Sequence, residues 1–278
     1  MANRARVLID CLDQKGLVYK VSKIFYEYGL NIVSNQEFVD KENQHFFMRS
    51  VIEGEFDSKK LENELTAVID GDAKIRVIEP KKKDIILMAT KESHALGDIL
   101  IRHQAGELNA NILAVIANRD NLKDLVERFD IPFIYINADG LKREEHEELV
   151  LKELDKYSFD YIVLAKYMRI LTPNFVSQHK GKIINIHHSF LPAFIGANPY
   201  KQAYERGVKI IGATAHFVTN DLDEGPIIAQ DVIPVNHRFS WRDMQQAGRD
   251  VEKIVLSRAL KMVLEDRVFV NDNKTVVF

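Results

Sequence analysis

The sequence predicts an α/β protein with two domains, and three observations support this prediction. The chain has 278 residues, which exceeds the usual length of one domain. Roughly the first 80 residues follow the order strand, helix, strand, strand, helix, strand. From Asp84 onward, near-continuous apolar runs alternate with helical stretches, as expected for a mostly parallel sheet that is covered on both faces.

The N-terminal domain is expected over residues 1–82 as a ferredoxin-like βαββαβ sandwich. One helix is predicted to begin after the turn at Asp13–Gly16 and to end at Gly29, where a left-handed residue is favoured. The second helix is predicted around 61–68. The strands are predicted at 4–10, 31–39, 44–53 and 73–78. Pro80 and the lysines that follow it indicate a linker, because proline cannot continue a strand.

The C-terminal domain is expected over residues 84–278 as a doubly wound, mostly parallel sheet. A helix over 143–157 is predicted to expose Arg143 and Glu147 to solvent. Ser240 and Asp243 predict a capping box at the start of a long final helix. The strands are predicted at 84–89, 111–117, 132–136, 159–165, 182–187, 209–218 and 226–235.

Composition excludes several classes of protein. The net charge of −3 gives no strong basic field for nucleic acid or for a membrane surface. A single cysteine, Cys11, rules out an internal disulfide and fits a reducing compartment. The N-terminus lacks the apolar core of a signal peptide, and no apolar run is long enough to cross a bilayer. We therefore expect a cytoplasmic protein that binds neither nucleic acid nor membrane.

The stretch KIINIHHSFLP, residues 182–192, carries the strongest signal for a functional site. Asn185 and His187 lie two apart at the end of a predicted strand, so their side chains leave the same face. Ligands bind at that edge of open α/β sheets. An isolated Asn-x-His pair is more often a core amide and a strand-end histidine with only structural roles. At this edge of the sheet, a structural and a functional role are about equally favoured. His188 is expected to point the other way and to be structural.

A second signal lies in the loop TNDLDEGP, residues 219–226. Asp221 and Glu224 are interpreted as solvated turn residues, whereas the glycine and proline hold Asp223 in a tight loop. An amide, an imidazole and a carboxylate can together stabilise an oxyanion, transfer a proton and position a nucleophile. No serine or cysteine stands in a nucleophile-elbow setting. The residues therefore favour direct attack on an acyl carbon, by water or by an amine.

Metal and dinucleotide cofactors are not expected. The histidines and acids, His216 and His237 among them, show no H-E-x-x-H or C-x-x-C spacing. The first strand of the second domain leads into residues 89–94, which contain no glycine. A G-x-G-x-x-G cradle for a dinucleotide is therefore absent, as is a phosphate-binding P-loop.

Residues 167–192, YMRILTPNFVSQHKGKIINIHHSFLP, and 215–228, AHFVTNDLDEGPII, closely resemble the folate-dependent formyltransferases. The resemblance covers roughly residues 84–278. It implies that Asn185, His187 and Asp223 form the catalytic trio and that a formylated folate is the substrate, with no cofactor. It further implies folate contacts from the following residues: Arg169, Ile170, Leu171, Val218 and Leu222. Core packing is an equally good explanation for Ile170 and Leu171.

Departures from the family pattern choose a function within it. The segment TKESHALG, residues 90–97, replaces the glycine- and serine-rich loop that holds a phosphorylated acceptor in relatives. His188 replaces the family's proline, and an extra domain precedes the catalytic one. The resemblance then implies hydrolysis of 10-formyltetrahydrofolate to formate and tetrahydrofolate, which supplies purine biosynthesis and balances folate pools. Two alternatives remain: transfer to an amine acceptor of the glycinamide ribonucleotide type, and a non-catalytic folate or amino-acid sensor.

The N-terminal domain resembles the ACT domains, which commonly bind amino acids. In such domains the loop entering the first helix takes part, and this implies an effector site at Asp13, Gly16 and Leu17. The same residues are needed merely to make the turn and begin the helix. ACT domains usually associate between chains, so a homo-oligomer is expected.

Overall fold

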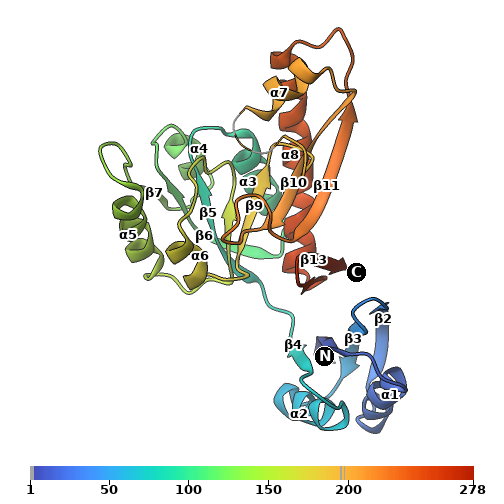
Figure 1. Ribbon diagram of the computed structural model, residues 1–278. Coiled ribbons are helices and arrows are strands. Elements are labelled where there is room, and N and C mark those ends of the chain that lie inside the picture. Colours follow the sequence, from blue (N-terminus) through green and yellow to red (C-terminus); the bar gives the residue numbers. More distant parts are fainter. Residues whose placement is uncertain (1–2, 195, 197) are drawn as a thin grey trace. The chain divides into compact units, whose positions relative to one another are not determined.

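The computed structural model describes residues 3–194, 196 and 198–278 and divides the chain into two units (Figure 1). The first unit contains the residues up to Lys81 together with 266–271 and 276–278. The second contains 82–265 and 272–275. The division after the first domain lies beside the predicted one. Residues 266–271 and 276–278 were expected in the second domain but belong to the first unit.

The first unit has the ferredoxin-like fold that the element order predicted. Its sheet has the order β2-β3-β1-β4, and the pairs β2–β3, β3–β1 and β1–β4 are all antiparallel. Both helices bury apolar residues in the core cluster that includes Val7 and Ile9 of β1. The elements are β1 (Asn3–Leu12), α1 (Leu17–Glu27), β2 (Asn31–Asp40), β3 (His45–Gly54), α2 (Ser58–Val68) and β4 (Lys74–Ile78).

The end of the chain covers part of the other face of this sheet. Strands β12 (Val268–Asn271) and β13 (Lys274–Val277) form a hairpin. Phe269 packs on Leu8 and Phe47, whose side chains point away from the helices because alternate strand residues face opposite ways. Arg6 forms an ion pair with Asp266 at 3.0 Å. The return of the chain therefore buries apolar surface that the helices leave open.

The second unit is built on a seven-stranded sheet of order β11-β10-β9-β8-β5-β6-β7. The strands from β7 to β9 are parallel, whereas β10 runs antiparallel to both of its neighbours. The sheet is therefore mostly parallel, as predicted. Its strands are β5 (Lys83–Ala89), β6 (Ala110–Ala117), β7 (Phe133–Tyr135), β8 (Tyr161–Leu164), β9 (Ile183–His187), β10 (Ile210–Phe217) and β11 (Ile227–Pro234).

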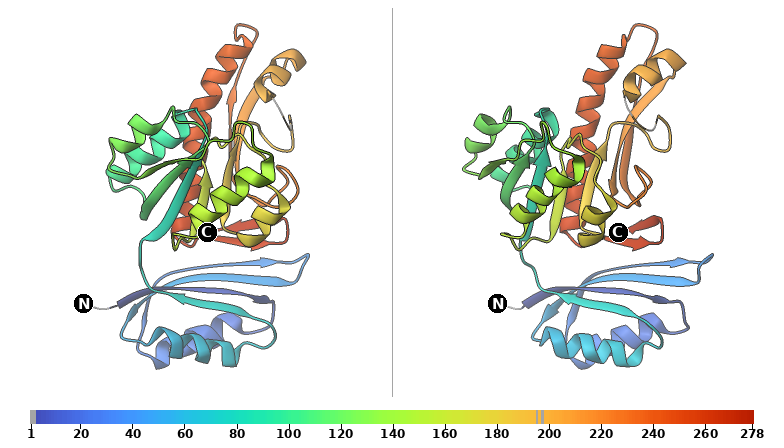
Figure 2. Two further views of the ribbon diagram at one scale, coloured as in Figure 1. Left: turned by 90° about the vertical axis from the view of Figure 1, so that its left-hand side faces the viewer. Right: turned by 60° about the vertical axis from the view of Figure 1, so that its left-hand side comes forward.

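Helices cover both faces of this sheet (Figure 2). On one face, α5 and α6 pack on a cluster that includes Ile86 and Ile183. The intervening strand residues Ile85 and Leu87 are equally buried, and α8, which contacts α3, lies on their side. The helices are α3 (His94–Gln104), α4 (Lys123–Glu127), α5 (Arg143–Leu154), α6 (Pro173–Gln178), α7 (Pro199–Arg206) and α8 (Trp241–Leu264).

Helix α8 begins at the capping residues that the sequence predicted. The Ser240 hydroxyl accepts a hydrogen bond from Asp243 N at 3.2 Å, and the Asp243 carboxylate accepts one from Ser240 N at 2.8 Å, so the predicted capping box is confirmed.

Glu147 was expected on the solvent face of α5 and is instead buried. Its carboxylate accepts hydrogen bonds from both the backbone N–H and the hydroxyl of Thr172. That contact fixes the segment before α6.

Candidate active site

A cavity of about 470 Å³ opens at the carboxyl ends of β8 and β9. Strand β6 lies on one side of β5, and β8 lies on its other side, so the strand order reverses at β5. Ligands bind beside such a reversal in open α/β sheets. Most of the lining comes from the carboxyl ends of β8, β9 and β10, the segments that follow them, α7 and α8. It includes Leu164, Lys166–Leu171, Asn185–His188, Tyr200, His216, Val218–Asp223, Arg249 and Glu252.

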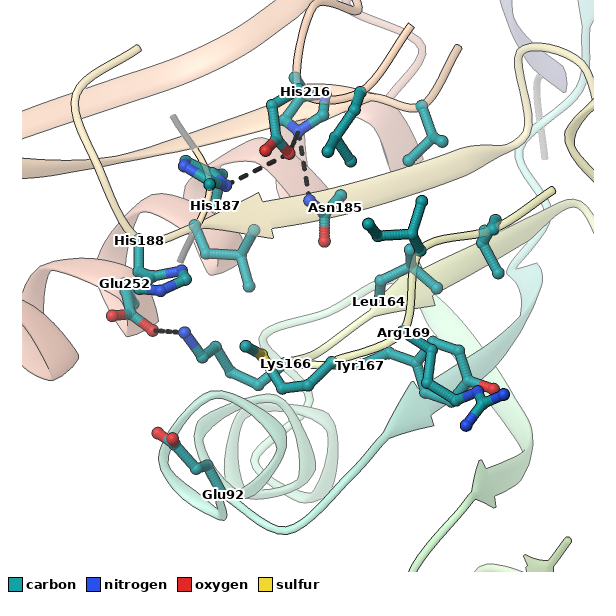
Figure 3. Close-up of a pocket in the computed structure, with 18 of the residues that line it drawn as sticks. Glu92, Leu164, Lys166, Tyr167, Arg169, Asn185, His187, His188, His216 and Glu252 are labelled. Atoms are coloured by element: carbon teal, nitrogen blue, oxygen red, sulfur yellow. Dashed lines mark hydrogen bonds and ion pairs between the residues drawn. The ribbon is translucent and has the colours of Figure 1, made fainter. Parts of the chain in front are cut away.

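Asn185 and His187 enter this cavity from one face of β9, as their spacing predicted (Figure 3). The Nδ1 atom of His187 lies 3.2 Å from Asp223 Oδ1. Because a carboxylate can only accept, Nδ1 carries the proton. The Nε2 atom of His187 is buried and has no hydrogen-bond partner in the part of the chain that the structure describes. That nitrogen is therefore the one available to a substrate.

Asp223 reaches His187 because of the backbone of its loop. Its φ is +59°, in the left-handed region that aspartate tolerates better than most residues. A Cβ atom on Gly225 would lie 1.8 Å from the carbonyl oxygen of Phe217, so only glycine lets the loop pass so close to the end of β10. Phe217 N also donates to Pro226 O at 2.9 Å. The aspartate, glycine and proline together therefore bring the carboxylate to β9.

His216 belongs to the same group, although the sequence suggested it only as an unsupported metal ligand. It stands directly opposite Asn185 in the antiparallel pairing of β10 with β9, so the two side chains share a face. Its Nδ1 donates to the Phe217 carbonyl at 2.9 Å, which leaves Nε2 as an acceptor. Nε2 therefore accepts from Asn185 Nδ2 at 3.2 Å. This fixes the Asn185 amide, whose second N–H has no hydrogen-bond partner among the described residues and can donate to a ligand.

The electrostatics keep these groups in complementary states. Burial tends to raise the pKa of Asp223, but the hydrogen bond and charge of His187 outweigh it and hold the pKa below its usual value. Burial lowers the pKa of His216, so this ring is neutral at pH 7. The site therefore contains a carboxylate beside His187 and a neutral imidazole that orients the amide.

His188 was expected to point away from the site, and this prediction is wrong. It lines the same cavity, with its ring centroid 5.2 Å from that of His187 and 5.9 Å from that of Tyr200. The strand ends at His187, so the alternation of faces no longer applies to the next residue. Burial, with the Lys166 charge next, lowers the pKa of His188 to about 3, so this ring is uncharged at pH 7.

A second polar group, here called the Glu252 cluster, was missed by sequence reasoning. Glu252 of α8 is 1% exposed. Its carboxylate lies 2.8 Å from His94 Nε2, 2.6 Å from Tyr200 Oη and 3.2 Å from Lys166 Nζ. Burial alone would raise the pKa of Glu252, but these partners, His94 first, lower it to about 2. The four residues come from four separate segments, so no local sequence pattern predicts that they lie together.

The expected folate contacts lie around the same cavity. Arg169, Ile170, Leu171, Val218 and Leu222 all line it. In Figure 3, Arg169 and Leu164 lie on the opposite side from His188 and Glu252, with Asn185 between them. Ile170 and Leu222 are 48% and 47% exposed, although both are large and apolar. Exposed apolar side chains at the wall of a cavity are typical of a site for an organic ligand.

The expected effector residues lie in the first unit. Asp13 is exposed, and its backbone N–H donates to Gln44 O at 2.8 Å. Gly16 has a φ of +83° and its carbonyl accepts the first α1 hydrogen bond, from Lys20 N. The Leu17 side chain is buried in the core. The turn therefore presents Asp13 and Gly16 at the surface and uses Leu17 for packing.

No group of three or more histidine, cysteine, aspartate or glutamate side chains in the described ranges of the chain is arranged to hold a metal ion. No helix among the described residues is both long and apolar enough to span a membrane.

Comparisons with known proteins agree with the two units. The formyl transferase family model matches residues 83–260, and the ACT domain model matches residues 5–70. The formyltetrahydrofolate deformylase of Haemophilus influenzae is 54% identical over 277 residues, covering 100% of both chains. The crystal structure of a formyltetrahydrofolate deformylase from Pseudomonas syringae superimposes with a TM-score of 0.96 at 42% identity, over 100% of this chain and 95% of that one.

A glycinamide ribonucleotide transformylase from Symbiobacterium toebii is less similar, with a TM-score of 0.68 at 27% identity over 70% of this chain and 94% of that one. The fold and the site thus define a two-domain enzyme with a formyl transferase domain and an ACT domain. Within that class, the chain belongs to the formyltetrahydrofolate deformylase family, whose members are hydrolases.

Proposed function

We propose that the protein hydrolyses 10-formyltetrahydrofolate to formate and tetrahydrofolate. The observation that carries this proposal is the pairing of His187 with Asp223 at 3.2 Å beside Asn185, inside one cavity. The three groups supply an oxyanion donor, a proton carrier and a carboxylate for water, which are the functions that hydrolysis of a formamide needs. Full-length similarity to formyltetrahydrofolate deformylases supports the same reaction.

The reaction begins with polarisation of the formyl group. The free N–H of Asn185 and the protonated Nε2 of His187 donate hydrogen bonds to the formyl oxygen. Asp223 stabilises the charged imidazole through Oδ1 and positions the water with its second carboxylate oxygen. Water adds to the formyl carbon while its proton passes to Asp223, directly or through a water chain, and a tetrahedral intermediate forms. The C–N bond then breaks, and the folate nitrogen leaves with a proton delivered through His187.

The folate occupies the end of the cavity that carries apolar side chains. Ile170, Leu171, Val218 and Leu222 present apolar surface to the pterin, and Arg169 lies beside them. Water is the second substrate, and the reaction needs no cofactor. With the pterin bound there, the formyl group lies near Asn185 and His187, at the middle of the cavity.

The decisive experiment is to measure formate release from 10-formyltetrahydrofolate in plain buffer without any amine. Steady production of formate with one equivalent of tetrahydrofolate supports hydrolysis. A requirement for an amine acceptor would instead indicate a transformylase, and binding of folate without turnover would indicate a sensor. The Asp223→Asn variant serves as the matched inactive protein.

The first unit acts as a regulatory ACT domain and holds the chain in a homo-oligomer. Its ligand is a free amino acid that contacts the turn at Asp13, Gly16 and Leu17. Calorimetric titration with glycine and with methionine, repeated as an activity assay, tests the effector. Neither heat nor a change in turnover would leave the domain an assembly role, which sedimentation velocity measures. In the cell, the enzyme supplies formate to purine biosynthesis and balances folate pools from the cytoplasm.

A further inference from the structure

Lys166 follows β8 and has an unusual backbone. Its φ is +63°, in the left-handed region that favours glycine and costs other residues about 1–2 kcal/mol. Lys166 is also only 4% exposed, so its ammonium group is buried. Each feature by itself costs stability. A residue held against both costs beside a cavity indicates a functional constraint.

The Glu252 cluster fixes the Lys166 side chain in place. Lys166 Nζ lies 3.2 Å from Glu252, and His94 and Tyr200 donate to the same carboxylate. Burial, together with the Glu252 charge, raises the pKa of Tyr200, so its hydroxyl keeps the proton that it donates. The carboxylate is therefore satisfied by groups of the chain itself, from three other segments.

The cluster lies on a defined side of the reaction centre. In Figure 3, Lys166, Glu252 and His188 face one side of the space below Asn185 and His187, and Leu164 and Arg169 lie on the other. This inference rests on the proposed function, which places the folate at the Arg169 end. The nucleophile must then reach the formyl carbon from the side of Lys166 and Glu252.

We propose that Lys166, held by Glu252, is a specificity-determining residue that fills the nucleophile's end of the cavity and admits water but not an amine. With water, the new bond joins the water oxygen to the formyl carbon, the folate C–N bond breaks, and the products are formate and the folate N–H. With an amine, the new bond joins nitrogen to the same carbon, and the amine loses a proton while the folate nitrogen gains one. Neither route involves oxidation or reduction, so available space decides between them.

The Lys166→Gly variant tests this assignment. Glycine adopts the left-handed backbone without strain and removes the whole stem from the cavity. The assay supplies 10-formyltetrahydrofolate with hydroxylamine or glycinamide, and it measures formate and the N-formyl product by mass spectrometry. We expect the wild type to yield formate with at most a trace of the N-formyl product. We expect Lys166→Gly to raise the ratio of N-formyl product to formate by about tenfold or more, as opening a pocket by several methylenes does.

Two controls separate space from other effects. Lys166→Met keeps the length of the stem without its charge and is expected to retain the wild-type ratio. Asp130→Gly replaces another left-handed residue, at φ +56°, which is exposed and does not line the cavity, and is expected to change nothing. Lys166→Gly removes the cation that pairs with the Glu252 carboxylate. If this variant fails to fold, the double variant Lys166→Gly/Glu252→Gln, which also lacks the carboxylate charge, is assayed in its place.

The outcomes are distinct. A folded Lys166→Gly protein, or the folded double variant, with the wild-type product ratio would overturn the proposal. So would Lys166→Met if it admitted amines as readily as Lys166→Gly, because the exclusion would then not reside in occupied space. Absence of formate from the wild type in plain buffer would refute the proposed hydrolysis itself, whatever the ratio in the variants.

Discussion

His187 Nδ1 lies 3.2 Å from Asp223 Oδ1, and both side chains are buried, with exposures of 6% and 9%. Charges attract each other more strongly in such surroundings than at a surface, because little water screens them. The carboxylate thus fixes the imidazole in one orientation. Strand β9 supplies the histidine, and the loop after β10 supplies the carboxylate.

Asp223→Asn should lower kcat by about 10³–10⁴-fold, since the charged imidazole loses its counter-ion and the water loses its acceptor. Folate affinity should stay within a few-fold, because the apolar end of the cavity is untouched. Formate release and equilibrium dialysis measure the two quantities. Glu224→Gln, at an exposed neighbour that does not line the cavity, is the control. Turnover of Asp223→Asn within a few-fold of wild type would contradict the role.

His216→Phe should lower kcat by roughly 10–10²-fold with little change in KM, because the Asn185 amide loses the acceptor that orients it. Asn185→Ala should cost more, since the donor itself is lost. The two effects should not add in the double variant, because His216 acts through Asn185. Steady-state kinetics of the three proteins provide the test. Multiplicative losses would mean that His216 acts independently of the amide.

Glu252→Gln should destabilise the protein by about 3–5 kcal/mol at pH 7, as expected when one partner of a buried ion pair is removed. The folded-state pKa of about 2 lies below the ordinary 4.5, so this stabilisation is present above pH 4.5 and is lost as the pH falls toward 2. The difference from wild type should therefore shrink in acid. Urea unfolding at pH 7 and at the lowest pH where both proteins fold measures it.

The control for this measurement is Glu148→Gln, which changes an exposed carboxylate on α5. Its unfolding free energy should stay within about 0.5 kcal/mol of wild type at both pH values. A Glu252→Gln protein with a pH-independent deficit would show that the carboxylate's charge is not what stabilises the cluster.

Gly248→Ala should also destabilise the protein, although alanine normally favours a helix by about 1 kcal/mol. A Cβ atom at Gly248 would lie 2.1 Å from the Tyr200 hydroxyl oxygen and 2.2 Å from its ring, so Tyr200 must move and its hydrogen bond to Glu252 is disrupted. The matched control is Gly97→Ala in α3, where the nearest atom lies at 3.9 Å. Thermal unfolding should show a lower Tm for the first and an equal or higher Tm for the second.

Much of the fold was predictable because it follows from local patterns. Alternating and continuous apolar runs predicted the strands of the two large sheets but not the hairpin of β12 and β13, and the Ser240 capping box marked the start of α8. The predictions failed where burial depends on a distant segment. Glu147 looked like a solvent-facing helix residue, yet Thr172 from the segment before α6 covers it. His188 followed the alternation of a strand that had already ended.

Short-range spacing, turn chemistry and motif resemblance were enough to predict the two-domain α/β organisation and to select Asn185, His187 and Asp223 as candidates for one site. The orientation of the Asn185 amide and the side chains that fill the cavity beside it follow instead from tertiary packing. His216 reaches Asn185 through the antiparallel register of β10 on β9, and the Glu252 cluster joins four segments. Strand register and the packing of helices onto a sheet are long-range properties, so no local pattern encodes them.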